Sequence, residues 1–185
     1  FFGCLLIGSY FISDGLLIYA KAGLAQYLIE SAWQQTLSGS NQVKPWPWAD
    51  TWPVGRLQSS RHNVDLYILD GTQGNALAFG PGHLQNSAQL ASSGSSIVAG
   101  HRDTHFTFMQ QLQHNDLLKV TNSNGDSMDY RVSSIDVVDS RKRLLYVDHH
   151  QSQLILVTCY PCQTCIAGGP LRYVATATAV STITI

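Results

Sequence analysis

Seven short runs rich in β-branched and aromatic residues follow one another from residue 64 to residue 180, and they constrain the fold more than any other feature. Turn signals made of Gly, Pro and Asn separate them, and no second domain boundary is visible. Strands this short need paired edges, so the pattern predicts a mainly β domain in a closed or nearly closed barrel, although the spacing alone does not separate a barrel from a sandwich. The runs cover residues 64–70, 76–79, 96–101, 116–122, 128–139, 153–159 and 171–180. A helical turn or two is expected at residues 107–113, where Phe108 and Leu112 are four residues apart.

The composition supports a folded core and argues against one class of partner. The chain has 185 residues, of which 44% are hydrophobic, and this is enough for a real core. Its 11 Lys and Arg are balanced by 12 Asp and Glu, which gives a formal net charge of −1. Because no basic stripe is present, the sequence gives no support to a nucleic-acid partner.

The N-terminal segment is almost wholly apolar, and we interpret residues 1–20 as a transmembrane anchor. About twenty helical residues span roughly 30 Å, the thickness of the hydrocarbon core of a bilayer, although Asp14 makes a full span costly. Ala20-Lys21-Ala22 allows the alternative of a signal-peptidase site. Apolar residues then recur at helical spacing, so we expect residues 21–40 to form a juxtamembrane helix, packed on the domain, and a short linker.

The segment from Pro45 to Pro53 contains three prolines and three tryptophans, which excludes a regular helix or a central strand. We predict an extended strap here. Its indoles, Trp46, Trp48 and Trp52, are expected to cover an apolar rim of the domain, where Trp33 from the preceding helix could join them.

Three candidate catalytic residues stand where a predicted strand ends or begins. One apolar run ends in Cys159, and Pro161 beyond it lacks the backbone N–H that a central strand needs. A second apolar run ends in His101, and Arg172 lies at the start of the last run. A thiol held at such a rim can act as a nucleophile when basic partners are near. Histidine would then serve as acid and base, and arginine would hold a developing oxyanion.

The order His101, then Val157-Thr158-Cys159, then Arg172 resembles the sortases, the cysteine transpeptidases of bacterial cell envelopes. Three further stretches make the chain resemble the Gram-negative class of that family. They are Leu77-Ala78-Phe79-Gly80-Pro81-Gly82-His83, Val98-Ala99-Gly100-His101-Arg102-Asp103 and the Trp-Pro cluster at residues 45–54. The resemblance implies a closed eight-stranded sortase-type β-barrel with short helices, which would form the catalytic domain at residues 41–185.

The resemblance also implies an activity. Cys159 would form a thioester with an LPxTG-like C-terminal sorting signal cleaved between Thr and Gly, and the acyl group would pass to an amine acceptor. The partners would be a substrate protein, the acceptor amine and the membrane. The domain would face the extracytoplasmic, periplasmic side of the inner membrane, and we expect no metal and no cofactor.

Five further residues are candidates for substrate binding around this triad: Val157, Thr158, His83, Asp103 and His149. A hydrogen bond that stabilises its Gly-Pro-Gly-His turn is the role we favour for His83. For Asp103 we favour a cap on the short helix that follows. His105 and His149 could line the substrate groove.

A rival interpretation rests on Cys159, Cys162 and Cys165, whose spacing suits metal binding or dithiol redox chemistry. Zinc would need a fourth ligand, such as His105 or His149. In an oxidising compartment a Cys162–Cys165 disulfide would instead leave Cys159 free. A second alternative, an L,D-transpeptidase, would require a Ser-His-Gly-Cys signature that the sequence lacks.

Overall fold

Eight strands, two α-helices and one 3-10 helix make up the part of the chain that the structure describes. The structure is a computed structural model that describes residues 2–142, 151–160 and 169–180, with side chains from residue 15 onward. In chain order the elements are α1 (Phe2–Leu37), β1 (Pro53–Ser59), β2 (Val64–Asp70), α2 (Gly74–Phe79), β3 (Gly82–His83), β4 (Ser95–Ala99), η1 (Thr107–Gln111), β5 (Leu117–Asn122), β6 (Ser127–Asp139), β7 (Gln153–Cys159) and β8 (Leu171–Ala179).

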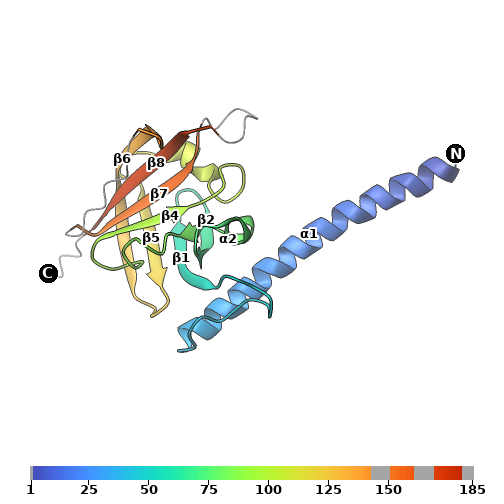
Figure 1. Cartoon of the computed structure of the whole chain (residues 1–185), viewed down its shortest axis with the longest axis horizontal. Coiled ribbons are helices and arrows are strands. Elements are labelled where there is room, and N and C mark those ends of the chain that lie inside the picture. The colour runs from blue at the N-terminus through green and yellow to red at the C-terminus, as the bar shows by residue number, and fades with distance from the viewer. Residues whose placement is uncertain (1, 143–150, 161–168, 181–185) are drawn as a thin grey trace.

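The strands close into one barrel in the order β1-β2-β3-β4-β7-β8-β6-β5 (Figure 1). The pairs β2–β3 and β4–β7 are parallel. The other six neighbouring pairs are antiparallel. The prediction of a closed eight-stranded barrel is therefore confirmed, and closure removes the exposed edges that a sandwich would have kept.

Successive side chains on a strand point to opposite faces of the sheet. Those on the inner face fill the barrel, and some of those on the outer face form a second apolar cluster. The inner core includes Val98 of β4 and Leu156 of β7, and residues around η1, such as Phe106, close one part of it. Ile97 and Ile155, one residue before each of these two, belong to a separate buried cluster. Because neighbouring residues on a strand point to opposite faces, this second cluster lies on the outside of the barrel at β4 and β7.

Helix α1 runs without a break, and its C-terminal half packs on the barrel while its N-terminal half projects away (Figure 1). Ile29 and Trp33 are 1% exposed, and the Gln26 side chain donates a hydrogen bond to the Phe79 carbonyl oxygen at 2.8 Å. The predicted packing of this helix on the domain is therefore confirmed. In contrast, Leu16 and Tyr19 are exposed.

A helix must be both long enough and apolar enough to cross a bilayer. No helix among the described residues meets both conditions. The anchor assigned to residues 1–20 stays a prediction.

Three short elements differ from those expected from the sequence. Residues 76–79 belong to helix α2 rather than to a strand, because Ala and Leu favour helix and four residues are too few to show a period. Strand β1 begins at Pro53, the last residue of the predicted strap. Strand β3 has only two residues and is defined by its partners on β2 and β4, so it leaves no local signal.

The tryptophan strap covers the barrel only in part. The Trp46 and Phe79 rings pack edge-on with their centroids 4.9 Å apart, and the Trp33 and Tyr67 ring centroids are 6.3 Å apart. Trp48 is 83% exposed, so the expectation that it covers the barrel is wrong. Trp46 and Trp52 are half-buried, so the cover comes from part of the strap.

Candidate active site

Strand register brings the three candidate catalytic residues together at one end of β7. Ala99 at the end of β4 pairs with Val157, and the Gly100 N–H donates to the Val157 carbonyl oxygen at 3.1 Å. His101 is the next residue along. On the other side of β7, Cys159 pairs directly with Arg172 of β8. Cys159 therefore lies between His101 on one neighbouring strand end and Arg172 on the other.

Arg172 is half-buried, and its strand position is directly opposite Cys159. Paired residues on antiparallel strands project from the same face of the sheet, so the Arg172 side chain shares the face of Cys159. Its Nη1 atom donates to the Gly169 carbonyl oxygen at 2.6 Å and to that of Leu171 at 2.9 Å. These bonds use one nitrogen of a guanidinium group that carries five N–H donors. Further donors therefore remain for a substrate oxygen.

Cys159 and Val157 face outward, whereas Thr158 between them faces the barrel interior. Cys159 is exposed and forms no disulfide with another described residue. Val157 packs with the outer cluster, whose buried members include Ile97, Ile155 and Val174. This apolar floor below Cys159 was missed at the sequence level. The signal that could have found it is the β-branched residue at every second position before the cysteine.

Thr158, which was predicted to bind substrate, is 3% exposed, and its hydroxyl donates to the Gly100 carbonyl oxygen at 2.7 Å. Its side chain does not share the face of Cys159. Thr158 therefore links β7 to the segment that follows β4 from inside the barrel.

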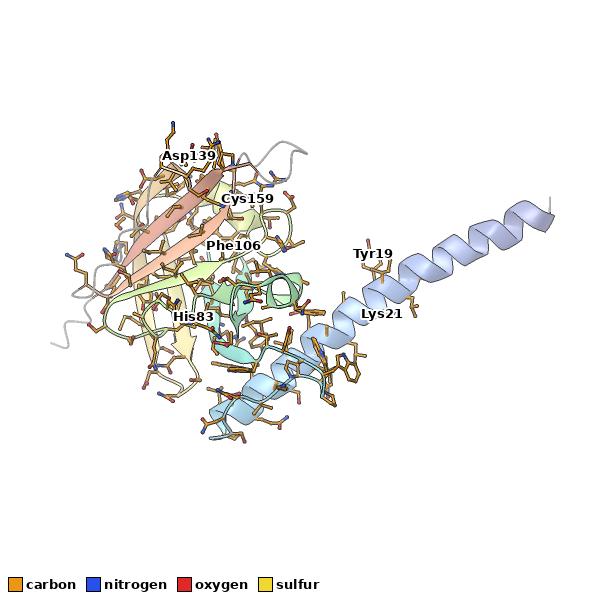
Figure 2. The ribbon with its side chains drawn as sticks, in the orientation of Figure 1. Tyr19, Lys21, His83, Phe106, Asp139 and Cys159 are labelled. Carbon is orange, nitrogen blue, oxygen red and sulfur yellow. The ribbon has the colours of Figure 1, made fainter. Side chains whose placement is uncertain are left out.

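His83 lies away from the thiol, as Figure 2 shows, with Cys159 toward the top of the barrel and His83 in its lower part. The imidazole is 8% exposed, and its Nε2 atom is 2.9 Å from the Ala88 carbonyl oxygen and 3.2 Å from the Ser87 hydroxyl. These contacts tie His83 to the loop that follows β3, at Ser87 and Ala88, and not to the Gly-Pro-Gly-His turn itself. Substrate binding by His83 stays a prediction that its burial does not favour.

Asp103 makes a local ion pair rather than the helix cap that we favoured. Arg102 donates two hydrogen bonds of 2.7 Å to its carboxylate, and these lower the pKa of Asp103. The 3-10 helix η1 is capped by Phe106, with no side-chain hydrogen bond. The capping prediction is wrong because the chain makes a further turn between Asp103 and the start of η1.

His105 is half-buried beside His101. Burial lowers the pKa of His105, and electrostatic repulsion by His101 lowers it further, against an opposing hydrogen bond that the imidazole donates to the Ala78 backbone. A cavity of about 350 Å³ opens next to it, between the turn at Asn63 and Thr104. His105 is thus part of the surroundings of His101, and its place in the substrate groove stays a prediction.

Several predicted residues cannot be placed. His149, Cys162 and Cys165 lie outside the described residues. Within the described ranges, no three His, Cys, Asp or Glu side chains are grouped to hold a metal ion. The metal and disulfide alternatives for the cysteine array therefore stay untested.

A buried carboxylate links the turn between β1 and β2 to the segment just before β5, and sequence reasoning missed it. The Asp116 side chain is 1% exposed and accepts hydrogen bonds from His62 at 2.7 Å, from the Gln113 N–H at 2.8 Å and from Arg61. Burial raises the pKa of Asp116, but the His62 and Gln113 hydrogen bonds and the Arg61 charge outweigh it, so the net shift is downward. The His62 side chain is 5% exposed and is held in this network.

Comparison with known proteins identifies the family. A family model described as the sortase domain matches residues 57–180. Sortase D of Bacillus subtilis strain 168 is 31% identical over 121 residues, which cover 65% of this chain. The chain spans 60% of the length of that relative.

Solved structures agree on the fold. A Clostridium perfringens Sortase D5 transpeptidase has a TM-score of 0.62 at 22% identity, covering 82% of this chain and 88% of its own. Clostridium perfringens sortase C, solved with the C-terminal cell wall sorting motif, has a TM-score of 0.61 at 19% identity, covering 87% of this chain and 90% of its own. The sortase-domain match runs from within β1 through β8 and includes His101, Cys159 and Arg172, so the chain belongs to the sortase family.

Proposed function

We propose that this chain is a cysteine transpeptidase that cleaves a C-terminal sorting signal and transfers the protein to an amine. The observation that carries the proposal is the register that sets Cys159 opposite Arg172 and next to the end of the His101 strand. A nucleophile, an acid–base group and a fixed cation on adjoining strand ends are what acyl transfer through a thioester requires.

In the first half of the proposed reaction, the Cys159 sulfur attacks the carbonyl carbon of the scissile peptide. Negative charge develops on the carbonyl oxygen, and the free N–H donors of Arg172 stabilise it. The C–N bond then breaks, His101 donates a proton to the departing amine, and the substrate remains as a thioester on Cys159.

In the second half, the acceptor amine attacks the thioester carbonyl and passes a proton to His101. A new amide bond forms as the C–S bond breaks, and the sulfur of Cys159 leaves. The enzyme returns to its starting state, because the proton that His101 lost in the first half is regained from the acceptor. No oxidant or other reagent is consumed.

The substrate class follows from the family and from the floor beside the thiol. We propose an LPxTG-like signal cleaved between Thr and Gly, with apolar side chains packed on the outer cluster near Val157. The Clostridium perfringens sortase C solved with a cell wall sorting motif supports this choice. We also propose, from the apolar sequence of residues 1–20, an anchor in the inner membrane with the domain outside the cytoplasm. Membership of the Gram-negative class stays a prediction.

The test incubates the protein with a library of LPxTG-like peptides and an amine, followed by mass spectrometry of the intact protein. We expect an acyl adduct on Cys159 and an amide product. Cys159→Ala should give neither and should keep a wild-type circular dichroism spectrum, while the matched thiol removal Cys4→Ala should retain both. Turnover by Cys159→Ala above a few per cent of wild type, or stoichiometric zinc in the purified protein, would favour the rival interpretation.

A further inference from the structure

Two buried residues of the barrel interior contact the backbone at Gly100 and His101. The first is Thr158, whose hydroxyl donates to the Gly100 carbonyl oxygen at 2.7 Å. Because Thr158 is the residue before Cys159, this bond ties the backbone next to the nucleophile to the backbone next to His101. The Thr158 side chain is 3% exposed and points away from the substrate face, so it acts from inside the barrel.

The second is Phe106, which lies inside the barrel below the thiol (Figure 2). Its backbone N–H donates to the His101 carbonyl oxygen at 3.0 Å, and its side chain is fully buried. The ring lies flat on the backbone of Gly100, where an added Cβ atom would be 2.8 Å from two ring carbons. A real Cβ atom does not approach a ring carbon that closely, so the contact requires glycine at this position.

The His101 side chain is exposed, and strand β4 ends at Ala99, two residues before it. The contacts of Thr158 and Phe106 therefore hold the backbone at His101, together with the bond from the Gly100 N–H to the Val157 carbonyl oxygen.

We propose that Thr158 and Phe106 are positioning residues that set the place of the His101 imidazole relative to the Cys159 sulfur. The inference rests on the proposed function for the roles of His101 and Cys159. In this proposal Thr158 acts from inside the barrel and does not contact the substrate. Its loss should lower kcat, because a displacement of about 1 Å in a reacting group such as the His101 imidazole costs up to roughly 100-fold in rate.

The chain offers a matched control for Thr158. Thr51 is also 3% exposed, and its hydroxyl donates to a backbone carbonyl oxygen, that of Asp70, at 2.8 Å. Thr158→Val and Thr51→Val therefore delete the same kind of buried bond. We expect kcat to fall about 10- to 100-fold in Thr158→Val and less than about twofold in Thr51→Val, with KM nearly unchanged in both. Thr158→Ser should return kcat to within about threefold of wild type. Equal losses in the two valine variants, or no rescue by serine, would overturn the proposal.

The contact of Phe106 with Gly100 is tested by a double-mutant cycle. Gly100→Ala should lower kcat because the new methyl group pushes against the ring, and Phe106→Leu should lower it because the backbone loses its support. In the double variant the smaller side chain makes room for the methyl group, so the combined loss should be less than the product of the two single losses. Losses that multiply would show that the two residues act independently and would contradict the proposal.

A spectroscopic measurement separates this inference from the proposed function. The ring C–H signals of His101 can be assigned in NMR spectra by their loss in His101→Ala. They should move in Thr158→Val and stay in place in Thr51→Val whether or not the protein transfers peptides. If they move while wild type shows no acyl adduct, the proposed function fails and the positioning role stands. If they do not move, the positioning role fails even in an active enzyme.

Discussion

Replacing Asp116 with Ala tests how much the buried carboxylate between the β1–β2 turn and Gln113 stabilises the fold. The change removes the acceptor for His62, for the Gln113 N–H and for Arg61. Removing one partner of a buried, charged network costs about 3–5 kcal/mol. The Arg61 side chain is 57% exposed, so water compensates its loss, and we expect about 3 kcal/mol in total. In a chain of this size that corresponds to a fall in Tm of roughly 6–12 °C.

The assay is urea unfolding followed by tryptophan fluorescence, with calorimetry for Tm. The matched control is Asp65→Ala, which breaks the pair of Asp65 with Arg56 at a position where the carboxylate side chain is 48% exposed. That loss should stay below about 1 kcal/mol. Asp116→Asn keeps one acceptor oxygen and should fall between the two. An Asp116→Ala protein no less stable than Asp65→Ala would refute the reasoning.

The same variant has a defined pH dependence. Because the pKa of Asp116 is lowered in the folded protein, the unfolded chain binds this proton more tightly. Its stabilisation is therefore fully present above about 3.9, the ordinary pKa of an aspartic acid, and is lost as the pH falls further through the folded-state value. The difference between wild type and Asp116→Ala should shrink in acid below about pH 4.

Three further outcomes are expected. Trp46→Ala should cost about 2 kcal/mol because its ring packs on Phe79, whereas Trp48→Ala at the exposed position should stay within about 0.5 kcal/mol; equal thermal melts would contradict this. His83→Ala should lose about 1 kcal/mol of stability and far less turnover than His101→Ala, and a well-folded but inactive His83→Ala would shift the assignment of the base. Burial and repulsion by His101 lower the pKa of His105, so the free energy of unfolding should fall as the pH drops below about 6.5. His105→Gln should weaken that pH dependence when urea unfolding is compared at pH 7.5 and 5.5, and an unchanged dependence would contradict the prediction.

The catalytic candidates could be predicted because each marks a local break in the sequence. Cys159 ends an apolar run before a proline, His101 ends another, and Arg172 follows a turn. These three residues come together only because their strands are neighbours, and the sequence pattern does not indicate which strands are neighbours. The family resemblance implied that arrangement, and the register of β4, β7 and β8 shows it at the level of the backbone.

Features without a local signal were missed. The bond of His62 with Asp116 joins residues that are 54 positions apart. The sequence around each residue does not indicate its partner. Strand β3 exists only through its pairing with two other strands. Trp48 and Trp46 sit in the same proline-rich segment, and only tertiary contact decides that one is covered and the other is not. Long-range contacts therefore limit what the sequence predicts here.

The parallel pairing of β4 with β7 also decides when Cys159 and His101 come together during folding. Gly100 and Thr158 are 58 residues apart, and their strands meet only after the intervening hairpin of β5 and β6 has been accommodated. Pairing over such a separation carries a large loop-closure entropy and belongs to the slow phase of folding. A partly folded chain in which β4 and β7 have not yet paired consequently keeps Cys159 apart from His101. The proposed transpeptidase activity should therefore return during refolding together with the slowest phase seen by fluorescence.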